Sequence, residues 1–133
     1  MENKAVIINK YEIIKRCINR INEEYAENPD SLEDYRKEDC IVLNLQRACE
    51  AVIDIAMYEV STKRLGVPQS KREAIELLYK NNLIEEKCYK NIKNMIGFRN
   101  IAVHDYRKIE PEILQDVIEN HLKDLEDFAK NFI

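Results

Sequence analysis

The stretch IVLNLQRACEAVIDIAM, residues 41–57, decides the fold, because apolar residues recur in it at helical spacing from end to end. The apolar positions three or four residues apart are Ile41, Leu45, Ala48, Val52, Ile55 and Ala56. Such a stripe predicts an α-helix that buries one face in a core. We expect this helix to run from about Arg36 to Leu65, because Gly66 supplies a C-terminal stop and Pro68 follows it.

Before this stretch, a second long helix is predicted from Lys4 to Glu27. Its apolar residues also recur every three or four positions, at Ile7, Tyr11, Ile14, Ile18, Ile21 and Tyr25. Pro29 ends it, because the residue before a proline is pushed out of the helical region. A short helical turn at residues 31–34 then leads into the long helix.

After the long helix, three more helices are predicted. The first opens with a capping box of Ser70 and Glu73 and ends near Asn81. The second runs from about Glu85 to Asp105 or Tyr106, and the third from Pro111 to the C-terminus. The residues of this last part that we expect to face inward are Ile113, Val117, Leu122, Leu125 and Phe128.

The predicted fold class is all-α, an antiparallel up-and-down bundle of four to five helices, because short loops imply antiparallel neighbours. A length of 133 residues permits one domain with a single core, residues 1–133. The chain contains no run of about 18 apolar residues, so we expect no membrane span and a cytoplasmic protein. Cysteines 17, 40, 49 and 88 lack metal-ligand spacing, so we expect free structural thiols and no metal site.

The net charge of −4 is unevenly distributed. The segment from Lys87 to Lys108 holds six basic residues and one acidic residue, Asp105, so it carries +5. The other 111 residues therefore carry −9. This asymmetry allows a local basic surface on an acidic protein, although a solvated helix face is the favoured interpretation of the charges taken alone.

Arg99 interrupts the apolar stripe of the helix from Glu85. Spacing from Ile92 and Ile96 requires an inward residue at position 99, and a buried guanidinium needs a partner, a cleft or an interface. Asn100 and His104 lie four residues apart and share a face, and Tyr106 shares the face of Arg99. The plainer interpretation of His104 is a favourable cation near a helix C-terminus.

A second polar set lies within the opening stretch, at Asn44, Gln46, Arg47 and Glu50. Arg47 and Glu50 are three residues apart, so we expect them to form an ordinary surface ion pair.

The pattern Arg99-(four residues)-His104-Asp105-Tyr106 resembles the R-x4-H-x-Y signature of the HepT-like toxins, a branch of the HEPN-domain ribonucleases. The segments at residues 41–57, 64–74 and 95–106 also resemble this family, in order and over nearly the whole chain. The resemblance implies a helical bundle that forms a homodimer, in which two copies of the motif meet at one composite cleft.

The resemblance also implies the toxin of a toxin–antitoxin pair, an endoribonuclease that needs no metal or cofactor. The implied partner is a minimal nucleotidyltransferase antitoxin that attaches AMP to the tyrosine of the motif, here Tyr106. Asn100 matches the polar residue that usually follows the arginine, and we expect it to orient the substrate or His104. Asp105 either orients a histidine or simply ends the helix.

Such chemistry suits these residues. Attack by the ribose 2′-hydroxyl needs a base and an acid, and a histidine gives or takes a proton near neutral pH. An arginine clamps phosphate oxygens. In the cleft of a dimer, the two copies of His104 would serve as base and acid, with Arg99 holding the phosphate. The alternative is a non-catalytic HEPN dimer that binds a nucleotidyltransferase or nucleotides, with Arg99 and His104 as interface groups.

Overall fold

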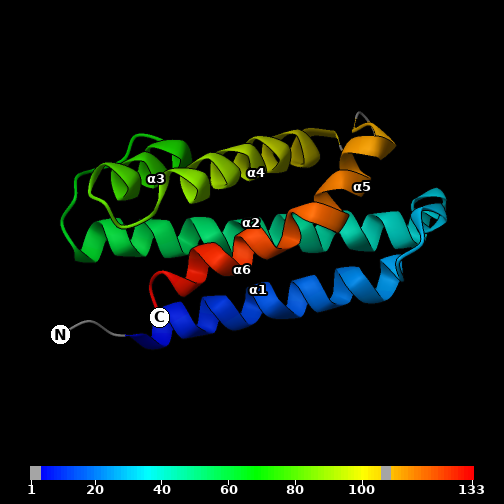
Figure 1. Ribbon diagram of the computed structural model, residues 1–133, viewed down its shortest axis with the longest axis horizontal. Helices are drawn as coiled ribbons and strands as arrows, with labels where there is room; N and C mark the ends of the chain where they lie inside the picture. The colour runs from blue at the N-terminus through cyan, green and yellow to red at the C-terminus, as the bar shows by residue number, and fades with distance from the viewer. Residues whose placement is uncertain (1–3, 106–108) are drawn as a thin grey trace.

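The computed structural model describes residues 4–105 and 109–133, and in them every regular element is helical. The α-helices are α1 (Lys4–Tyr25), α2 (Tyr35–Thr62), α3 (Lys71–Lys80), α4 (Glu86–Asp105), α5 (Pro111–Asn120) and α6 (Leu122–Lys130). A 3₁₀ helix, η1 (Pro29–Glu33), joins α1 to α2. Neighbouring long helices run antiparallel, as Figure 1 shows, so the all-α bundle predicted from the sequence is confirmed.

Polar side chains cap the turn between α1 and α2. The side chain of Asn28 accepts a hydrogen bond from the amide of Asp30 at 3.0 Å. Asp34 then caps α2, because its carboxylate accepts from the amides of Arg36 and Lys37. These acceptors satisfy amides that a helix start leaves without partners, so the chain reverses sharply at the predicted place.

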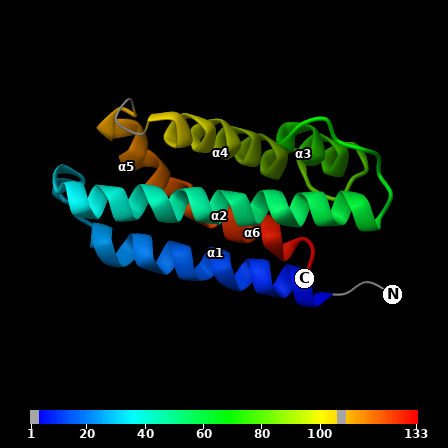
Figure 2. The ribbon, with the colours of Figure 1, turned by 180° about the vertical axis from the view of Figure 1, so that it is seen from behind.

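Helix α2 is the centre of the molecule. It packs against α1, α3, α4 and α6, and the apolar residues predicted from Ile41 to Ala56 are buried. Helix α6 covers one face of α2 in Figure 1, whereas Figure 2 shows the opposite face of α2 uncovered, between α1 and α4. This open face carries the exposed side chains of Leu43, Arg47, Glu50, Asp54 and Met57.

The C-terminal end of α2 and the capping contacts of α3 differ from what the sequence predicted. Helix α2 ends at Thr62, because Arg64 takes the left-handed conformation with φ 55° and the amide of Leu65 donates back to the carbonyl of Val60. The helix therefore ends before Gly66, the residue that we expected to stop it. At α3, Ser70 caps the amide of Glu73 as predicted, whereas Glu73 accepts from the amide of Gln69.

The helix predicted from Pro111 to the C-terminus is two helices. His121 separates them with φ −124° and ψ −4°, so α6 can turn back over α2 (Figure 1). Among the predicted inward residues, Val117, Leu122, Leu125 and Phe128 are buried, but Ile113 is 49% exposed. Leu114 is buried in the core instead, together with Val117 and Ile118 of the same helix.

No helix within residues 4–105 and 109–133 has the length and apolar character needed to cross a membrane.

Candidate functional site

Arg99 lies on α4 and turns toward α2, as its position on the apolar stripe predicts. Its side chain is only 14% exposed. Nη2 lies 3.1 Å from Oε1 of Glu50 on α2, and Nη1 donates to Oδ1 of Asn100 at 3.2 Å. Nε is buried and, within the described part of the chain, has no hydrogen-bond partner. The guanidinium is therefore held by Glu50 and Asn100, while its Nε–H donates to no group of the described residues.

Asn100 and His104 lie on the outer face of α4 and are exposed. Together with Ile101 and Asp105 they line an open hollow of about 550 Å³. The hydrogen bond from Arg99 to Asn100 links the arginine to the edge of this hollow. The structure thus brings Asn100 and His104 to one surface and joins Arg99 to it through Asn100.

Tyr106 lies outside the described residues, so the structure does not test its predicted position.

Glu50 has a different partner from the one that we expected. The predicted surface pair of Arg47 and Glu50 is wrong, because Glu50 pairs with Arg99 from another helix. Asn44 is buried and donates to the carbonyl of Cys40 at 2.8 Å. In the sequence, Glu50 stands out only as a member of a dense polar set. Its partner Arg99 lies 49 residues away, so no local pattern identifies the pair.

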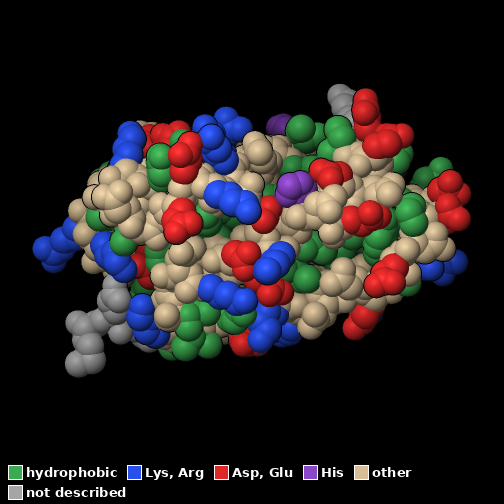
Figure 3. Space-filling view, in the orientation of Figure 1, with side chains coloured by type: hydrophobic (Ala, Val, Ile, Leu, Met, Phe, Trp, Pro, Cys, Tyr) green, Lys and Arg blue, Asp and Glu red, His purple; other side chains and the backbone are tan. Residues whose placement is uncertain are grey.

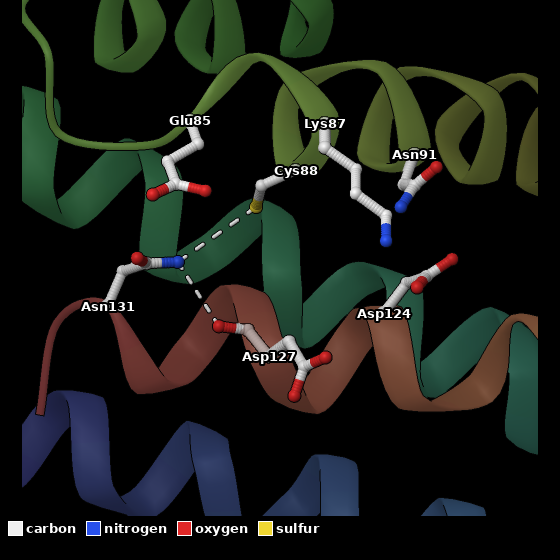
Figure 4. Close-up of a pocket in the computed structure, with 7 residues that line it drawn as sticks. All are labelled: Glu85, Lys87, Cys88, Asn91, Asp124, Asp127 and Asn131. Carbon is white, nitrogen blue, oxygen red and sulfur yellow. Dashed lines mark hydrogen bonds between the residues drawn. The ribbon is translucent and has the colours of Figure 1, made fainter.

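A second hollow, of about 320 Å³, lies between the start of α4 and the end of α6 (Figure 4). Its lining residues are Glu85, Lys87, Cys88, Asn91, Asp124, Asp127 and Asn131. Figure 4 shows Lys87 reaching toward Asp124 across the hollow. Burial, followed by the nearby carboxylates, raises the pKa of the Cys88 thiol to about 11. Since the thiolate is the reactive form, Cys88 is a structural thiol at neutral pH.

All four cysteines lie among the described residues and are free thiols, as predicted. Burial raises the pKa of Cys49 to about 12, and it raises the pKa of Cys17 as well. Within residues 4–105 and 109–133, no three His, Cys, Asp or Glu side chains are grouped to hold a metal ion.

The second histidine, His121, stands apart from the Arg99 region. Its Nδ1 lies 3.0 Å from Asp124 and its Nε2 lies 3.2 Å from Asp116. The hydrogen bond with Asp124 is the main cause that raises the pKa of His121. These contacts tie the end of α5 to the start of α6, so His121 has a structural explanation.

Two lysines of the basic segment on α4 have partners on the same helix. Lys90 pairs with Glu86 at 2.9 Å, and Nζ of Lys93 lies 5.2 Å from the ring centre of Tyr89. On the face shown in Figure 3, acidic side chains gather at the end formed by α5 and η1, and most Lys and Arg side chains lie over the rest. On this face the acidic end is thus separated from most of the basic side chains.

Comparison with known proteins gives a consistent result. A family model described as "Ribonuclease HepT-like" matches residues 7–132. The chain is 46% identical over 123 residues to the mRNA nuclease HepT of Shewanella oneidensis, covering 92% of each protein.

Solved structures agree with this match. A toxin–antitoxin crystal structure with AMP-PNP superimposes with a TM-score of 0.91 at 44% identity, covering 96% of both chains. A tri-AMPylated Shewanella oneidensis HEPN toxin in complex with MNT antitoxin gives a TM-score of 0.90 at 44% identity, covering 98% of this chain and 97% of that one.

Proposed function

The chain belongs to the HepT-like ribonuclease family, and we propose that it is the toxin of a toxin–antitoxin pair, an endoribonuclease that cleaves cytoplasmic RNA without a metal ion. The observation that carries this proposal is the junction of Arg99, Asn100 and His104 on α4. A guanidinium held by Glu50 and Asn100 is linked through Asn100 to an open hollow that His104 also lines.

Arg99 binds the phosphate that is cleaved. The guanidinium carries a permanent positive charge and several donors, and its Nε has no partner within the described chain. Because Glu50 and Asn100 already orient the side chain, little conformational freedom is lost when a phosphate binds. The charge of Arg99 stabilises the negative charge that builds up on the phosphorane oxygens.

His104 moves protons in the reaction. The ribose 2′-hydroxyl loses its proton to one imidazole and attacks the phosphorus. The bond from phosphorus to the 5′-oxygen breaks, and a second imidazole protonates that oxygen. The products are a 2′,3′-cyclic phosphate and a 5′-hydroxyl. One protomer has a single motif histidine, so the second imidazole is His104 of another copy of this chain.

The open face of α2 and the adjoining edge of α4 form the dimer surface. Val103 lies one turn beyond Arg99 on α4 and is 49% exposed, and Leu43 on α2 is 44% exposed. Arg99 and Glu50 are paired, and α2 and α4 run antiparallel (Figure 2). Val103, which follows Arg99, and Leu43, which precedes Glu50, therefore lie on the same side of this pair. Two exposed apolar side chains thus lie beyond the Arg99–Glu50 pair, where a second copy would cover them.

The antitoxin is a minimal nucleotidyltransferase that attaches AMP to Tyr106. The structurally similar HEPN toxin is tri-AMPylated and bound to an MNT antitoxin, which supports this proposal. Tyr106 follows His104 by two residues, so a nucleotide there adds bulk and negative charge beside the site of the RNA phosphate.

The test is RNA cleavage in excess EDTA by purified protein, after intact mass shows that Tyr106 is unmodified. We expect fragments with 2′,3′-cyclic phosphate ends, and loss of cleavage in Arg99→Ala and His104→Ala. Matched controls are Arg16→Ala, an exposed arginine of α1, and His121→Gln, the other histidine. Both controls should keep their activity.

The non-catalytic dimer is the second candidate, because the Arg99–Glu50 pair is also a plausible structural contact. It takes the lead if folded, dimeric and unmodified protein cuts no RNA from a broad cellular pool.

A further inference from the structure

Gly97 lies in the interior of α4, where glycine is among the least favourable residues. An ideal Cβ at position 97 would lie 3.4 Å from Nη2 of Arg72. That spacing is at the short limit of ordinary van der Waals contact, so a Cβ at position 97 would touch the guanidinium in its present place. Gly97 therefore makes room for Arg72 of α3 to lie directly against α4.

Arg72 has no evident structural reason to be there. It lies in the first turn of α3, where the helix dipole disfavours a cation. Its side chain is exposed, and within residues 4–105 and 109–133 no carboxylate lies at ion-pair distance from it. An exposed guanidinium at the positive end of a helix is a favourable place for an anion.

The Arg72 guanidinium and His104 lie on the same face of α4. Gly97 and His104 are seven residues apart, which is close to two full turns and about 10 Å along the axis. Asn100 lies between them on this face, at the edge of the hollow that His104 lines. A path along the surface of α4 thus leads from His104 at the site, past Asn100, to the guanidinium of Arg72.

Lys93 extends this path, since it lies one turn before Gly97 on α4. Its ammonium group lies 5.2 Å from the ring centre of Tyr89, which stacks on Tyr79 of α3 with 4.4 Å between the rings. The stack joins α3 to α4 and so keeps the two cationic side chains, Arg72 and Lys93, on one surface.

We propose that Arg72, seated on Gly97, binds a backbone phosphate of the RNA substrate near the phosphate that is cleaved at Arg99 and His104. This inference rests on the proposed ribonuclease function. A guanidinium grips two phosphate oxygens in a fixed orientation but reads no base. Arg72 therefore sets the register of the strand at the site and does not set the sequence that is cut.

The test measures binding of a labelled single-stranded RNA to the His104→Ala protein at several salt concentrations. Arg72→Gln keeps the side-chain length and removes the charge, and we expect the Kd to rise roughly fivefold to tenfold. The slope of log Kd against log salt should shrink by about 0.7, the value for one lost contact to a single strand. Lys71→Gln is the matched control, because it removes the same charge from the neighbouring exposed position. It should change the Kd less than twofold.

Gly97→Ala is a second variant, in which we expect the melting temperature to rise and the RNA affinity to fall. Alanine favours the helix, so the melting temperature should rise, while the new methyl group touches the guanidinium and should lower RNA affinity by a smaller factor than Arg72→Gln does. In protein with His104 intact, Arg72→Gln should raise KM for RNA cleavage and leave kcat within about threefold.

Equal effects of Arg72→Gln and Lys71→Gln would overturn the proposal, as would unchanged RNA affinity in both Arg72→Gln and Gly97→Ala. Failure of the proposed function is a separate result, because then the protein with His104 intact binds and cuts no RNA before any change at Arg72.

Discussion

Nη2 of Arg99 and Oε1 of Glu50 lie 3.1 Å apart, and this ion pair joins the helix of the R-x4-H motif to the middle of the central helix α2. The arginine is mostly buried, whereas the glutamate is half exposed. The exposed carboxylate therefore orients a guanidinium that has little freedom to move, at the point where the open face of α2 meets α4.

Glu50→Gln should reduce RNA cleavage about tenfold, which corresponds to about 1.4 kcal/mol of transition-state stabilisation. The reason is that Arg99 loses its charged partner and holds the phosphate less firmly. Because the pair is partly exposed, the free energy of unfolding should change by less than about 1 kcal/mol. Glu24→Gln is the matched control, since Glu24 pairs with Arg20 within α1 at 3.3 Å. The positioning role is wrong if both variants lose activity equally.

Arg99→Met should abolish cleavage and leave the fold as stable or more stable by up to about 1 kcal/mol. The substitution removes a buried Nε that has no partner in the described chain, and such a group typically costs about 1–3 kcal/mol. Denaturant unfolding of this variant and of Arg47→Met, an exposed control, measures the difference. A loss of more than about 2 kcal/mol for Arg99→Met alone would identify Arg99 as a structural residue.

Val103→Glu and Leu43→Glu should each convert a dimer to a monomer and remove most RNA cleavage. A buried carboxylate in an apolar contact is strongly unfavourable, whereas both side chains are exposed in the single chain. Sedimentation velocity measures the assembly, and the melting temperature checks the fold. Ile8→Glu, at another exposed apolar position on α1, should stay dimeric and active. Full activity of a monomeric variant would contradict the composite site.

Ile55→Ala should lower the free energy of unfolding by about 3 kcal/mol, because it leaves a cavity in the core around α2. Ile55 is fully buried, whereas Ile8 on α1 is 46% exposed. Ile8→Ala is therefore the control, with an expected change below about 1 kcal/mol. Similar values for the two variants would contradict the place of Ile55 in the core.

The stability of the protein should fall as the pH rises through the titration of His121. Its pKa is raised, chiefly by the hydrogen bond with Asp124, so the folded state holds the proton more tightly than the unfolded state. The stabilisation is complete below the unfolded pKa of about 6.5 and is lost as the pH rises through the higher folded value. The melting temperature should thus decrease as the pH rises above about 6.5, and less steeply in His121→Gln or Asp124→Asn. Identical slopes in wild type and both variants would refute this linkage.

The sequence predicted the helices well wherever one apolar stripe extended over several turns. Helices α1, α2 and α4 lie within a few residues of their predicted bounds, because helical periodicity is a local property. The break at His121 was not predicted, since the apolar spacing continues across it and the break depends on contacts of His121 with Asp116 and Asp124. The sequence shows a glycine at position 97 inside a predicted helix, which indicates a close contact there. It does not identify the contacting residue, because Arg72 lies on a different helix.

By itself, the sequence determined that the chain is an all-helical bundle, that Arg99 must point inward, and that Asn100 and His104 share a face. These properties follow from the rotation of about 100° per residue along a helix. Only the tertiary structure decided that Glu50 pairs with Arg99 and not with Arg47, that Arg72 lies on Gly97, and that one face of α2 stays open. Periodicity defines which side of a helix is buried, but the packing of whole helices selects the residue that each buried or exposed group meets.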